Sequence, residues 1–341
     1  MPALAALYPL IKPLLFKLDP EVAHTVTVKM MVMMHKLGLI QSMAPGKQTP
    51  VNALGLTFPN VLGLAAGMDK SASAVEAWGA LGFGAVEVGT LTPRPQPGNP
   101  KPRLFRLPQH QALINRMGFN NPGIQSAVER LRKRQTKAVV GVNIGKNFDT
   151  PNERAVDDYL ACLKAAYPVA DYITVNISSP NTKGLRDLQG EEAIRSLLGT
   201  LQTEQAVLEK KHGRHAPVVV KIAPDLEELH IEALAKVFNE LGTEGVIATN
   251  TTLSRAAVAG HPQEKEAGGL SGAPVTRRST EVIAAFRSLL KPQIPVIGVG
   301  GIMCGADARD KLRAGAKLVQ VYSGLVYAGP GLVGDVLAQV E

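Results

Sequence analysis

Eight short runs of apolar and β-branched residues recur along the chain after residue 60, and segments with helical periodicity separate them. The runs cover residues 61–65, 85–89, 138–143, 172–176, 218–222, 245–249, 295–299 and 317–322. The helical segments cover residues 71–81, 122–135, 153–167, 191–211, 226–241, 274–289 and 306–314. Runs that are apolar on both faces are typical of parallel strands covered by helices. The alternation therefore predicts an α/β protein with eight strands.

Eight such units in about 280 residues agree with a (β/α)8 barrel, which needs roughly 250 residues plus insertions. An open, doubly wound sheet is the alternative, but the first strand-to-helix turn lacks a GxGxxG motif. We therefore predict a (β/α)8 TIM barrel over residues 51–341. Active sites of such barrels lie at the C-terminal ends of the strands, so the polar residues there are the candidates.

The first fifty residues do not share this alternation. Apolar residues repeat at helical spacing from Leu4 to Leu15, and Asp19, Pro20 and Glu21 supply the cap, the N1 proline and the acidic first turn of a second, Met-rich helix. Five lysines, Lys47 among them, against two acidic residues give this segment a charge of +3. We treat residues 1–50 as an N-terminal amphipathic helical hairpin. It could cap the barrel or lie on an anionic lipid surface, and periodicity leaves both alternatives open.

The chain is basic overall, with 37 Lys and Arg against 29 Asp and Glu and a formal charge of +8. Residues 91–137 carry ten of these cations and one acid, Glu129. We interpret the cluster from Arg130 to Arg134 as a solvated helix face. Aromatic residues make up 4% of the chain and do not interleave with that cluster, which argues against a single-stranded nucleic acid as partner.

Sequence patterns also argue against a membrane-spanning protein, a secreted protein and a metal-binding protein. No apolar run approaches the roughly 18 residues of a spanning helix. The N-terminus lacks the features of a secretory signal, and Cys162 and Cys304 are the two cysteines, so we expect reduced thiols in a cytoplasmic setting. The absence of HxH, CxxC and HExxH patterns predicts no metal site.

Polar residues follow several of the predicted strands. The small residues Ala66 and Gly67 would let a flat ligand approach the backbone, and Lys70 adds a cation, although a tight turn with a surface lysine is the alternative. Asn143 and Asn176 end two further runs. Amides offer both donors and acceptors, which suits a planar ring such as a pyrimidine or an isoalloxazine.

Two further features indicate an anionic ligand. Lys221 is a lone charge inside the apolar run 218–222, where it needs a partner or an anionic ligand. Glycines follow the last two strands, and backbone amides at that place commonly bind phosphate in this fold. They belong to the segments Gly298-Val299-Gly300-Gly301 and Tyr322-Ser323-Gly324. A flat, polar cofactor with one phosphate, such as FMN, would satisfy both features.

Six motifs spread over nearly the whole chain can now be compared with known families. They read AGMDK (66–70), GTLTPRPQPGN (89–99), NRMGFN (115–120), NISSPNT (176–182), TNTT (249–252) and GLSG (269–272). In this combination the chain resembles the dihydroorotate dehydrogenase family, in its quinone-dependent (class 2) branch. Position 179 supports that branch, because soluble relatives carry a cysteine where this chain has Ser179.

The resemblance implies a set of site residues. One FMN per chain would contact Ala66, Gly67, Met68, Asp69, Lys70, Thr90, Asn143, Asn176, Lys221, Thr249, Gly272, Gly301, Tyr322 and Ser323. Dihydroorotate would contact Lys70, Asn115, Arg116, Met117, Gly118, Phe119, Asn176, Asn181, Asn250 and Thr251. Ser179 would remove the C5 proton while C6 delivers hydride to the flavin, and a serine needs a proton relay for that task. The quinone-side positions fall on His24, Arg106 and Tyr322.

The resemblance also implies partners and a location. The hairpin would form an apolar tunnel for ubiquinone or menaquinone and bind an anionic membrane surface, with the protein a peripheral monomer on the cytoplasmic face of a bacterial inner membrane. No nucleic acid is expected. The residues alone leave two rivals: a cofactor-free barrel lyase or isomerase that binds a sugar phosphate through the same glycines, and a basic membrane- or RNA-binding adaptor on an inactive barrel.

Overall fold

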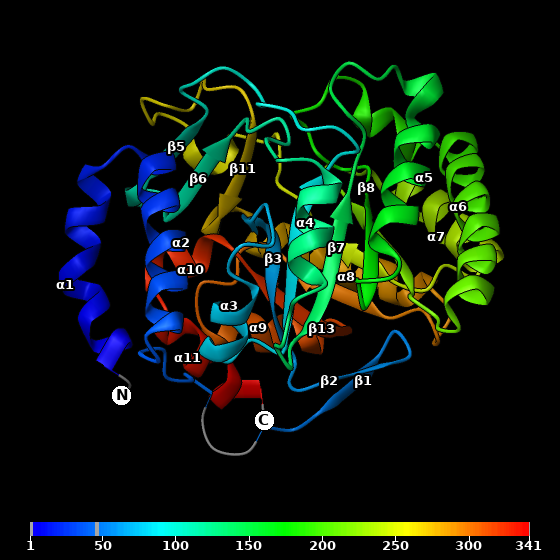
Figure 1. Cartoon of the computed structure of the whole chain (residues 1–341). Coiled ribbons are helices and arrows are strands. Elements are labelled where there is room, and N and C mark those ends of the chain that lie inside the picture. Colours follow the sequence, from blue (N-terminus) through cyan, green and yellow to red (C-terminus); the bar gives the residue numbers. More distant parts are fainter. Residues whose placement is uncertain (1–2, 45–47, 341) are drawn as a thin grey trace.

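Each of the eight predicted runs forms a strand in the computed structural model, which describes residues 3–44 and 48–340 (Figure 1). The strands follow one another around a closed barrel, and each pairs in parallel with its neighbours. They are β3 (Leu62–Asp69), β4 (Ala85–Leu91), β7 (Val139–Ile144), β8 (Tyr172–Asn176), β9 (Val218–Ile222), β10 (Val246–Ala248), β12 (Val296–Val299) and β13 (Ala316–Val321). The prediction of a (β/α)8 TIM barrel is confirmed.

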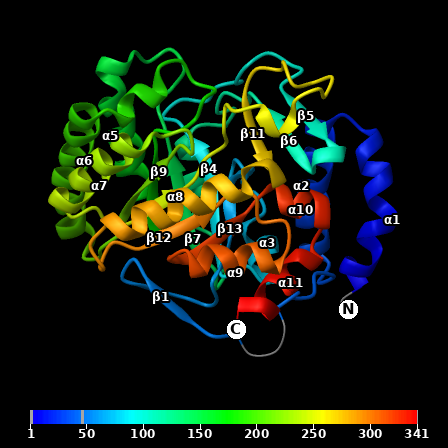
Figure 2. The same cartoon turned by 180° about the vertical axis from the view of Figure 1, so that it is seen from behind.

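Helices surround the barrel on its outer face, as Figures 1 and 2 show from opposite sides. They are α3 (Val75–Leu81), α4 (Ile124–Leu131), α5 (Ala155–Ala166), α6 (Glu191–His212), α7 (Glu228–Leu241), α8 (Thr276–Leu289), α9 (Gly305–Arg313), α10 (Ser323–Ala328) and α11 (Gly331–Val340). The segment 71–81 becomes helical later than predicted. The Asp69 carboxylate accepts hydrogen bonds from the backbone N–H groups of Ser73 and Ala74, at 2.9 and 2.7 Å, and this holds the start of the segment in a turn.

The N-terminal segment forms two helices that stand beside the barrel, α1 (Ala3–Lys17) and α2 (Pro20–Lys36) (Figures 1 and 2). The predicted cap of the second helix is confirmed, since Asp19 Oδ1 accepts hydrogen bonds from the N–H groups of Glu21 and Val22. Lys47, which contributes to the charge of +3, lies outside the described residues. Within residues 3–44 and 48–340, no helix has the length and apolar character that crossing a membrane requires.

Two small antiparallel sheets, which the sequence pattern does not predict, lie at opposite ends of the barrel (Figure 1). The hairpin of β1 (Val51–Ala53) and β2 (Leu56–Phe58) covers the end where the barrel strands begin, and Leu54 and Phe58 pack there against Tyr172. The other sheet has the order β11-β6-β5 and consists of β5 (Leu104–Leu107), β6 (Ala112–Asn115) and β11 (Gly269–Gly272). Short 3-10 turns cover Pro108–His110, Asn152–Arg154, Leu185–Gln189, Ala256–Val258 and Ala273–Val275. With one end covered, the C-terminal ends of the strands form the open end of the barrel.

A buried carboxylate, Glu87 of β4, lies inside the barrel with no exposed surface. Its two oxygens accept hydrogen bonds from Asn143 Nδ2 (2.8 Å), Tyr172 Oη (3.0 Å) and Gln320 Nε2 (2.9 Å). These donors come from β7, β8 and β13. Glu87 therefore links four strands through three side-chain hydrogen bonds.

The turn between α1 and α2 is fastened to β5 by two arginines. Arg103 donates to both carboxylate oxygens of Glu21, at 3.0 and 2.7 Å, and 7% of the Arg103 side chain and 14% of the Glu21 side chain are exposed. Arg106 donates to the backbone carbonyls of Leu15 and Leu18 at the end of α1. The hydrogen bond from Arg103 lowers the pKa of Glu21. The two helices are therefore held at their connecting turn by buried polar contacts.

The first prediction concerns this turn. Glu21→Ala should weaken the attachment of α2 by about 3 kcal/mol, because it leaves the buried Arg103 charge unpaired. Hydrogen exchange within α2 should rise accordingly. Because the folded pKa of Glu21 is lowered, its contribution is present above pH 4.5 and should be lost as the pH falls through the folded value. Lys101→Ala is the control, since the Lys101 ammonium lies 3.6 Å from Glu21 but is 66% exposed. Equal effects of the two variants would contradict the assignment.

The second prediction concerns the barrel interior. Glu87→Gln should lower the free energy of unfolding by about 2 kcal/mol or more, because the new amide places a donor against groups that already donate. Tyr172→Phe removes one of the three donors and should cost about 1 kcal/mol. Chemical denaturation of both variants measures the difference. A Glu87→Gln protein as stable as the native one would show that the carboxylate does not organise the barrel.

Candidate active site

A polar cavity with a volume of about 1030 Å³, including its open mouth, lies at the C-terminal ends of the barrel strands. Most of the predicted flavin and substrate residues line it, together with the predicted base. They are Ala66, Gly67, Lys70, Thr90, Asn115, Met117, Gly118, Phe119, Asn176, Ser179, Asn181, Lys221, Thr249, Asn250, Thr251, Gly272, Gly301, Tyr322 and Ser323. The structure therefore brings together residues from all over the barrel sequence at the place where sequence analysis expects a site.

Four predicted residues do not line this cavity. Met68 lies in the wall of a neighbouring apolar cavity. Asp69 accepts hydrogen bonds from the turn that precedes α3. Asn143 is fully buried behind the cavity wall. Arg116 turns outward, where its guanidinium pairs with Glu266 at 2.6 Å and lies over the ring of Phe105.

Side-chain amides and hydroxyls form a connected chain along the cavity wall. Asn143 Oδ1 accepts from the hydroxyl of Thr90 (2.6 Å) and from Asn176 Nδ2 (3.2 Å). Asn176 Oδ1 accepts from the hydroxyl of Ser178 (3.0 Å), whose oxygen accepts from Asn250 Nδ2 (3.0 Å). The Asn143 amide is in turn held by the carboxylate in the barrel interior. Each amide thus has a fixed orientation, which is what recognition of a planar polar ring requires.

The ammonium groups of two cavity lysines, half-buried Lys70 and buried Lys221, make no hydrogen bond to any residue in the described part of the chain. Burial lowers the pKa of Lys70 to about 8, although the charge of Glu21 opposes the shift. Burial also lowers the pKa of Lys221, and the charge of Glu87 opposes that shift. A buried ammonium without an acceptor is costly. Both ammonium groups are therefore available to donate hydrogen bonds to acceptor atoms of a ligand.

Ser179, the predicted base, lies in the wall of the polar cavity. It is 5% exposed, and its oxygen accepts a hydrogen bond from the N–H of Asn181 at 3.2 Å. No titratable side chain among the described residues bonds to it. The arrangement leaves the Ser179 proton free, so a water molecule or a ligand atom would have to receive it.

Several observations fit a flavin with one phosphate. The buried atoms Asn181 Oδ1, Thr251 Oγ1 and Gln320 Oε1 have no hydrogen-bond partner in the described residues. Gly272 and Gly301 line the cavity with positive φ angles, where a side chain would be strained and would meet backbone or side-chain atoms at 2.2 and 2.3 Å. Residues 3–44 and 48–340 contain no group of three or more His, Cys, Asp or Glu side chains arranged for a metal ion.

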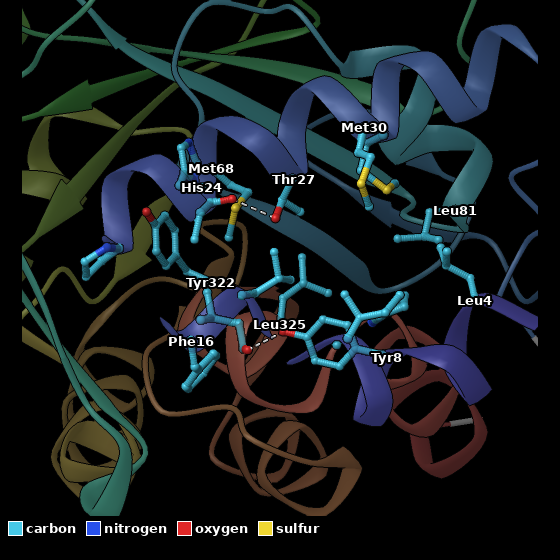
Figure 3. Close-up of a pocket in the computed structure, with 18 of the residues that line it drawn as sticks. Leu4, Tyr8, Phe16, His24, Thr27, Met30, Met68, Leu81, Tyr322 and Leu325 are labelled. Atoms are coloured by element: carbon cyan, nitrogen blue, oxygen red, sulfur yellow. Dashed lines mark hydrogen bonds between the residues drawn. The ribbon is translucent and has the colours of Figure 1, made fainter. Parts of the chain in front are cut away.

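A second cavity, of about 1080 Å³ including its mouth, lies between the N-terminal helices and the barrel, and its wall is almost entirely apolar (Figure 3). Residues of α1, α2 and α10, among them leucines, methionines and aromatic residues, supply most of that wall. The three predicted quinone-side residues, His24, Arg106 and Tyr322, all line it. Figure 3 shows His24 and Tyr322 at one end of the cavity, away from Leu4 and Leu81. Tyr322 is the residue common to the linings of both cavities.

The polar groups of this apolar cavity have strongly altered acidity. Burial lowers the pKa of His24 to about 3, and the charge of Lys70 acts in the same direction, so its imidazole is neutral at pH 7. Burial raises the pKa of Tyr322 to about 12 and therefore keeps its phenol protonated. Burial lowers the pKa of Arg106, whose guanidinium lies over the ring of Phe16 at 4.7 Å. The cavity presents neutral hydrogen-bonding groups together with one cation already bound to α1.

Sequence analysis missed two interior residues that shape the site. Gln320 lines the polar cavity, and Glu87 holds the amide of Asn143. The signal for Glu87 is present in the sequence, because it is a lone charge in the apolar run 85–89, just as Lys221 is in 218–222. Gln320 lies in the run 317–322 and gives a weaker signal of the same kind.

Comparison with known proteins assigns the family. The profile of the family described as dihydroorotate dehydrogenase matches residues 48–341. Dihydroorotate dehydrogenase (quinone) of Chromobacterium violaceum is 58% identical over 330 residues, which cover 96% of each chain. The protein with the same name from Marinobacter nauticus is 53% identical over 336 residues, covering 98% of this chain and 99% of that protein.

Two solved structures of dihydroorotate dehydrogenases have a fold similar to that of this chain. The crystal structure of dihydroorotate dehydrogenase from Eimeria tenella in complex with ferulenol matches with a TM-score of 0.87 and 38% identity, over 96% of this chain and 93% of that chain. A ligand-free structure of the enzyme from the same organism matches with a TM-score of 0.86. The chain is therefore an oxidoreductase that belongs to the dihydroorotate dehydrogenase family, in its quinone-dependent class.

Proposed function

We propose that this protein oxidises (S)-dihydroorotate to orotate in the polar cavity with one bound FMN, and passes the electrons to a membrane quinone in the apolar cavity. The reaction is a step of de novo pyrimidine (UMP) biosynthesis. One observation carries the proposal: a polar cavity with two lysines whose ammonium groups lack a hydrogen-bond acceptor shares a single residue, Tyr322, with an apolar cavity under the N-terminal helices. Each cavity suits one of the two chemically different reactants.

FMN is the cofactor that the polar cavity suits. The ring would be held by Thr90, Asn176 and Thr249 and by the charge of Lys221, with Asn143 fixing the amides from behind. The phosphate would be held by the backbone of Gly272 and Gly301 and by Ser323. When bound, FMN would supply the hydride acceptor for C6 of dihydroorotate. A positive charge such as that of Lys221 favours added electron density on a reduced ring.

Dihydroorotate would occupy the mouth of the same cavity. The asparagines 115, 181 and 250 offer amide donors and acceptors to a pyrimidine ring, and Lys70 offers a cation to its carboxylate. The hydroxyl of Ser179 would take the proton from C5. Since serine is a weak base, the proton must pass on from its oxygen to water, and polarisation of the substrate by Lys70 makes C5 more acidic.

The quinone, ubiquinone or menaquinone, would enter the apolar cavity between α1 and α2. His24 and Tyr322 lie together at one end of it, and both are neutral at pH 7. A neutral pair can hydrogen-bond to quinone oxygens without the cost of burying a charge. Arg106 would add a positive field from its place at the end of α1.

The outer faces of α1 and α2 would bind an anionic membrane surface. They expose a set of large apolar side chains, Leu7, Leu10, Leu14, Leu18, Val22, Val26 and Met33. Exposed patches of this kind mark contact surfaces, and lysines nearby would add about 1 kcal/mol each toward anionic lipid. We propose a peripheral monomer on the cytoplasmic face of a bacterial inner membrane.

The third prediction tests the base. Ser179→Ala should slow the reduction of bound flavin by dihydroorotate about 100-fold or more, because the acceptor of the C5 proton is lost. Bound flavin should be retained. Stopped-flow absorbance of the flavin measures the rate. Ser254→Ala, an exposed serine outside both cavities, should leave it unchanged. Flavin reduction at the native rate in the Ser179 variant would refute the assignment.

The fourth prediction tests the apolar cavity. Thr27→Phe places a ring inside it and should slow the reduction of a long-tailed quinone about tenfold or more, whereas reduction of the flavin by dihydroorotate should not change. Thr25→Phe on the same helix is the control, because Thr25 is exposed and does not line the cavity. If Thr27→Phe reduces the quinone as fast as the control does, the quinone does not use this cavity.

A further inference from the structure

A buried lysine, Lys311 of α9, lies outside both cavities and has no exposed surface. Its ammonium donates to Ser279 Oγ (2.6 Å), Thr280 Oγ1 (3.0 Å) and the carbonyl of Thr276 (3.3 Å). No carboxylate in the described part of the chain lies within salt-bridge distance of it. A buried charge with neutral acceptors alone is costly, so its retention calls for a compensating anion.

The ammonium of Lys311 lies at the N-terminus of α8. All three acceptors belong to the first turns of α8, and the N-terminus of a helix carries a partial positive charge. A cation placed there is therefore unfavourable for a second reason. Burial lowers the pKa of Lys311 to about 8, with the charges of Asp307 and Asp310 opposing the shift. An anion close to the N-terminus of α8 would offset both the cost of burying the ammonium and its repulsion by the positive end of the helix.

The groups that bind Lys311 connect it to the glycine segment of the polar cavity. The hydroxyl of Ser279 donates to the carbonyl of Gly300 (2.8 Å), and the hydroxyl of Thr276 donates to the carbonyl of Gly301 (2.7 Å). Gly300 and Gly301 both line the cavity. A side chain at Gly301 would meet Thr276 at 2.3 Å, so the glycine backbone rests directly on α8.

These two contacts determine the direction of the peptide groups. In a planar trans peptide the C=O and the following N–H point in opposite directions. Because the carbonyls of Gly300 and Gly301 are held toward α8, the N–H groups of Gly301 and Ile302 face away from it, toward the cavity. Neither N–H donates to any residue that the structure describes. The cavity wall thus presents two N–H groups without an acceptor, and the buried ammonium of Lys311 lies behind them.

We propose that Lys311 is a positioning residue for a phosphate group in the polar cavity, acting through Ser279 and Thr276 on the glycine segment. Its charge adds to the field of the free N–H groups. Its hydrogen bond to Ser279 Oγ keeps that hydroxyl turned toward the carbonyl of Gly300, and its bond to the backbone carbonyl of Thr276 holds the residue whose hydroxyl donates to Gly301. The inference rests on the proposed function, in which the phosphate belongs to FMN. Lys311 would thus contribute to recognition of the phosphate although it does not line the cavity.

Riboflavin provides a sharp test, because it has the ring of FMN without the phosphate. The full-length protein with its flavin is incubated with increasing riboflavin, and the retained flavins are separated and quantified. The equilibrium competition gives the preference for FMN over riboflavin directly. Lys311→Met should lower that preference about tenfold, or about 1.4 kcal/mol, while riboflavin affinity stays unchanged. A merely structural role would weaken both flavins alike.

Two further variants complete the design. Ser279→Ala removes one relay with little change of volume and should lower the preference in the same direction, which keeps the test decisive if Lys311→Met does not fold. Lys146→Met is the matched control, since Lys146 is 2% exposed and donates to the carbonyl of Thr150, away from the cavity. It should change stability and not the preference.

The outcomes separate the two proposals. If the native protein prefers FMN and the variants of Lys311 and Ser279 keep that preference, the role of Lys311 is refuted and the proposed function stands. If the native protein binds neither flavin, the proposed function fails, and the role of Lys311 fails with it.

Discussion

The carboxylate of Glu87 inside the barrel is the interaction on which the geometry of the open end depends. It accepts from Asn143, Tyr172 and Gln320 and so joins β4, β7, β8 and β13 across the interior. Because it only accepts, the Asn143 amide must turn its oxygen outward, toward Thr90 and Asn176. One buried charge thereby sets the orientation of a chain of amides that ends in the cavity wall.

Three lysines, one half-buried and two buried, cost folding stability at or behind the polar cavity. Lys70 and Lys221 reach the polar cavity without an acceptor, and Lys311 supports the glycine segment from behind. An apolar side chain would be cheaper at each place in the absence of a ligand. The position of these three cations at or behind one cavity is the reason to assign that cavity an anionic ligand.

The sequence predicts the barrel because each strand is a short apolar run, and it predicts Lys221 because a charge interrupts such a run. The three-stranded sheet escapes prediction because β11 pairs with β6, about 150 residues earlier. Lys311 escapes because it stands in α9 among Asp307, Arg309 and Asp310, a pattern that indicates a solvated face, and the packing of α8 decides its burial. Arg116 is next to site residues in sequence, yet its pairing with Glu266 turns it outward.

Tyr322 lies in the wall of both cavities, and no other described residue does. Two reactants that use these cavities never compete for the same space. We therefore expect a compound that fills the apolar cavity to inhibit without competing with the ligand of the polar cavity. Because the two linings share a single residue, we also expect substitutions in α1 and α2 to reshape the apolar cavity while the wall of the polar cavity is preserved.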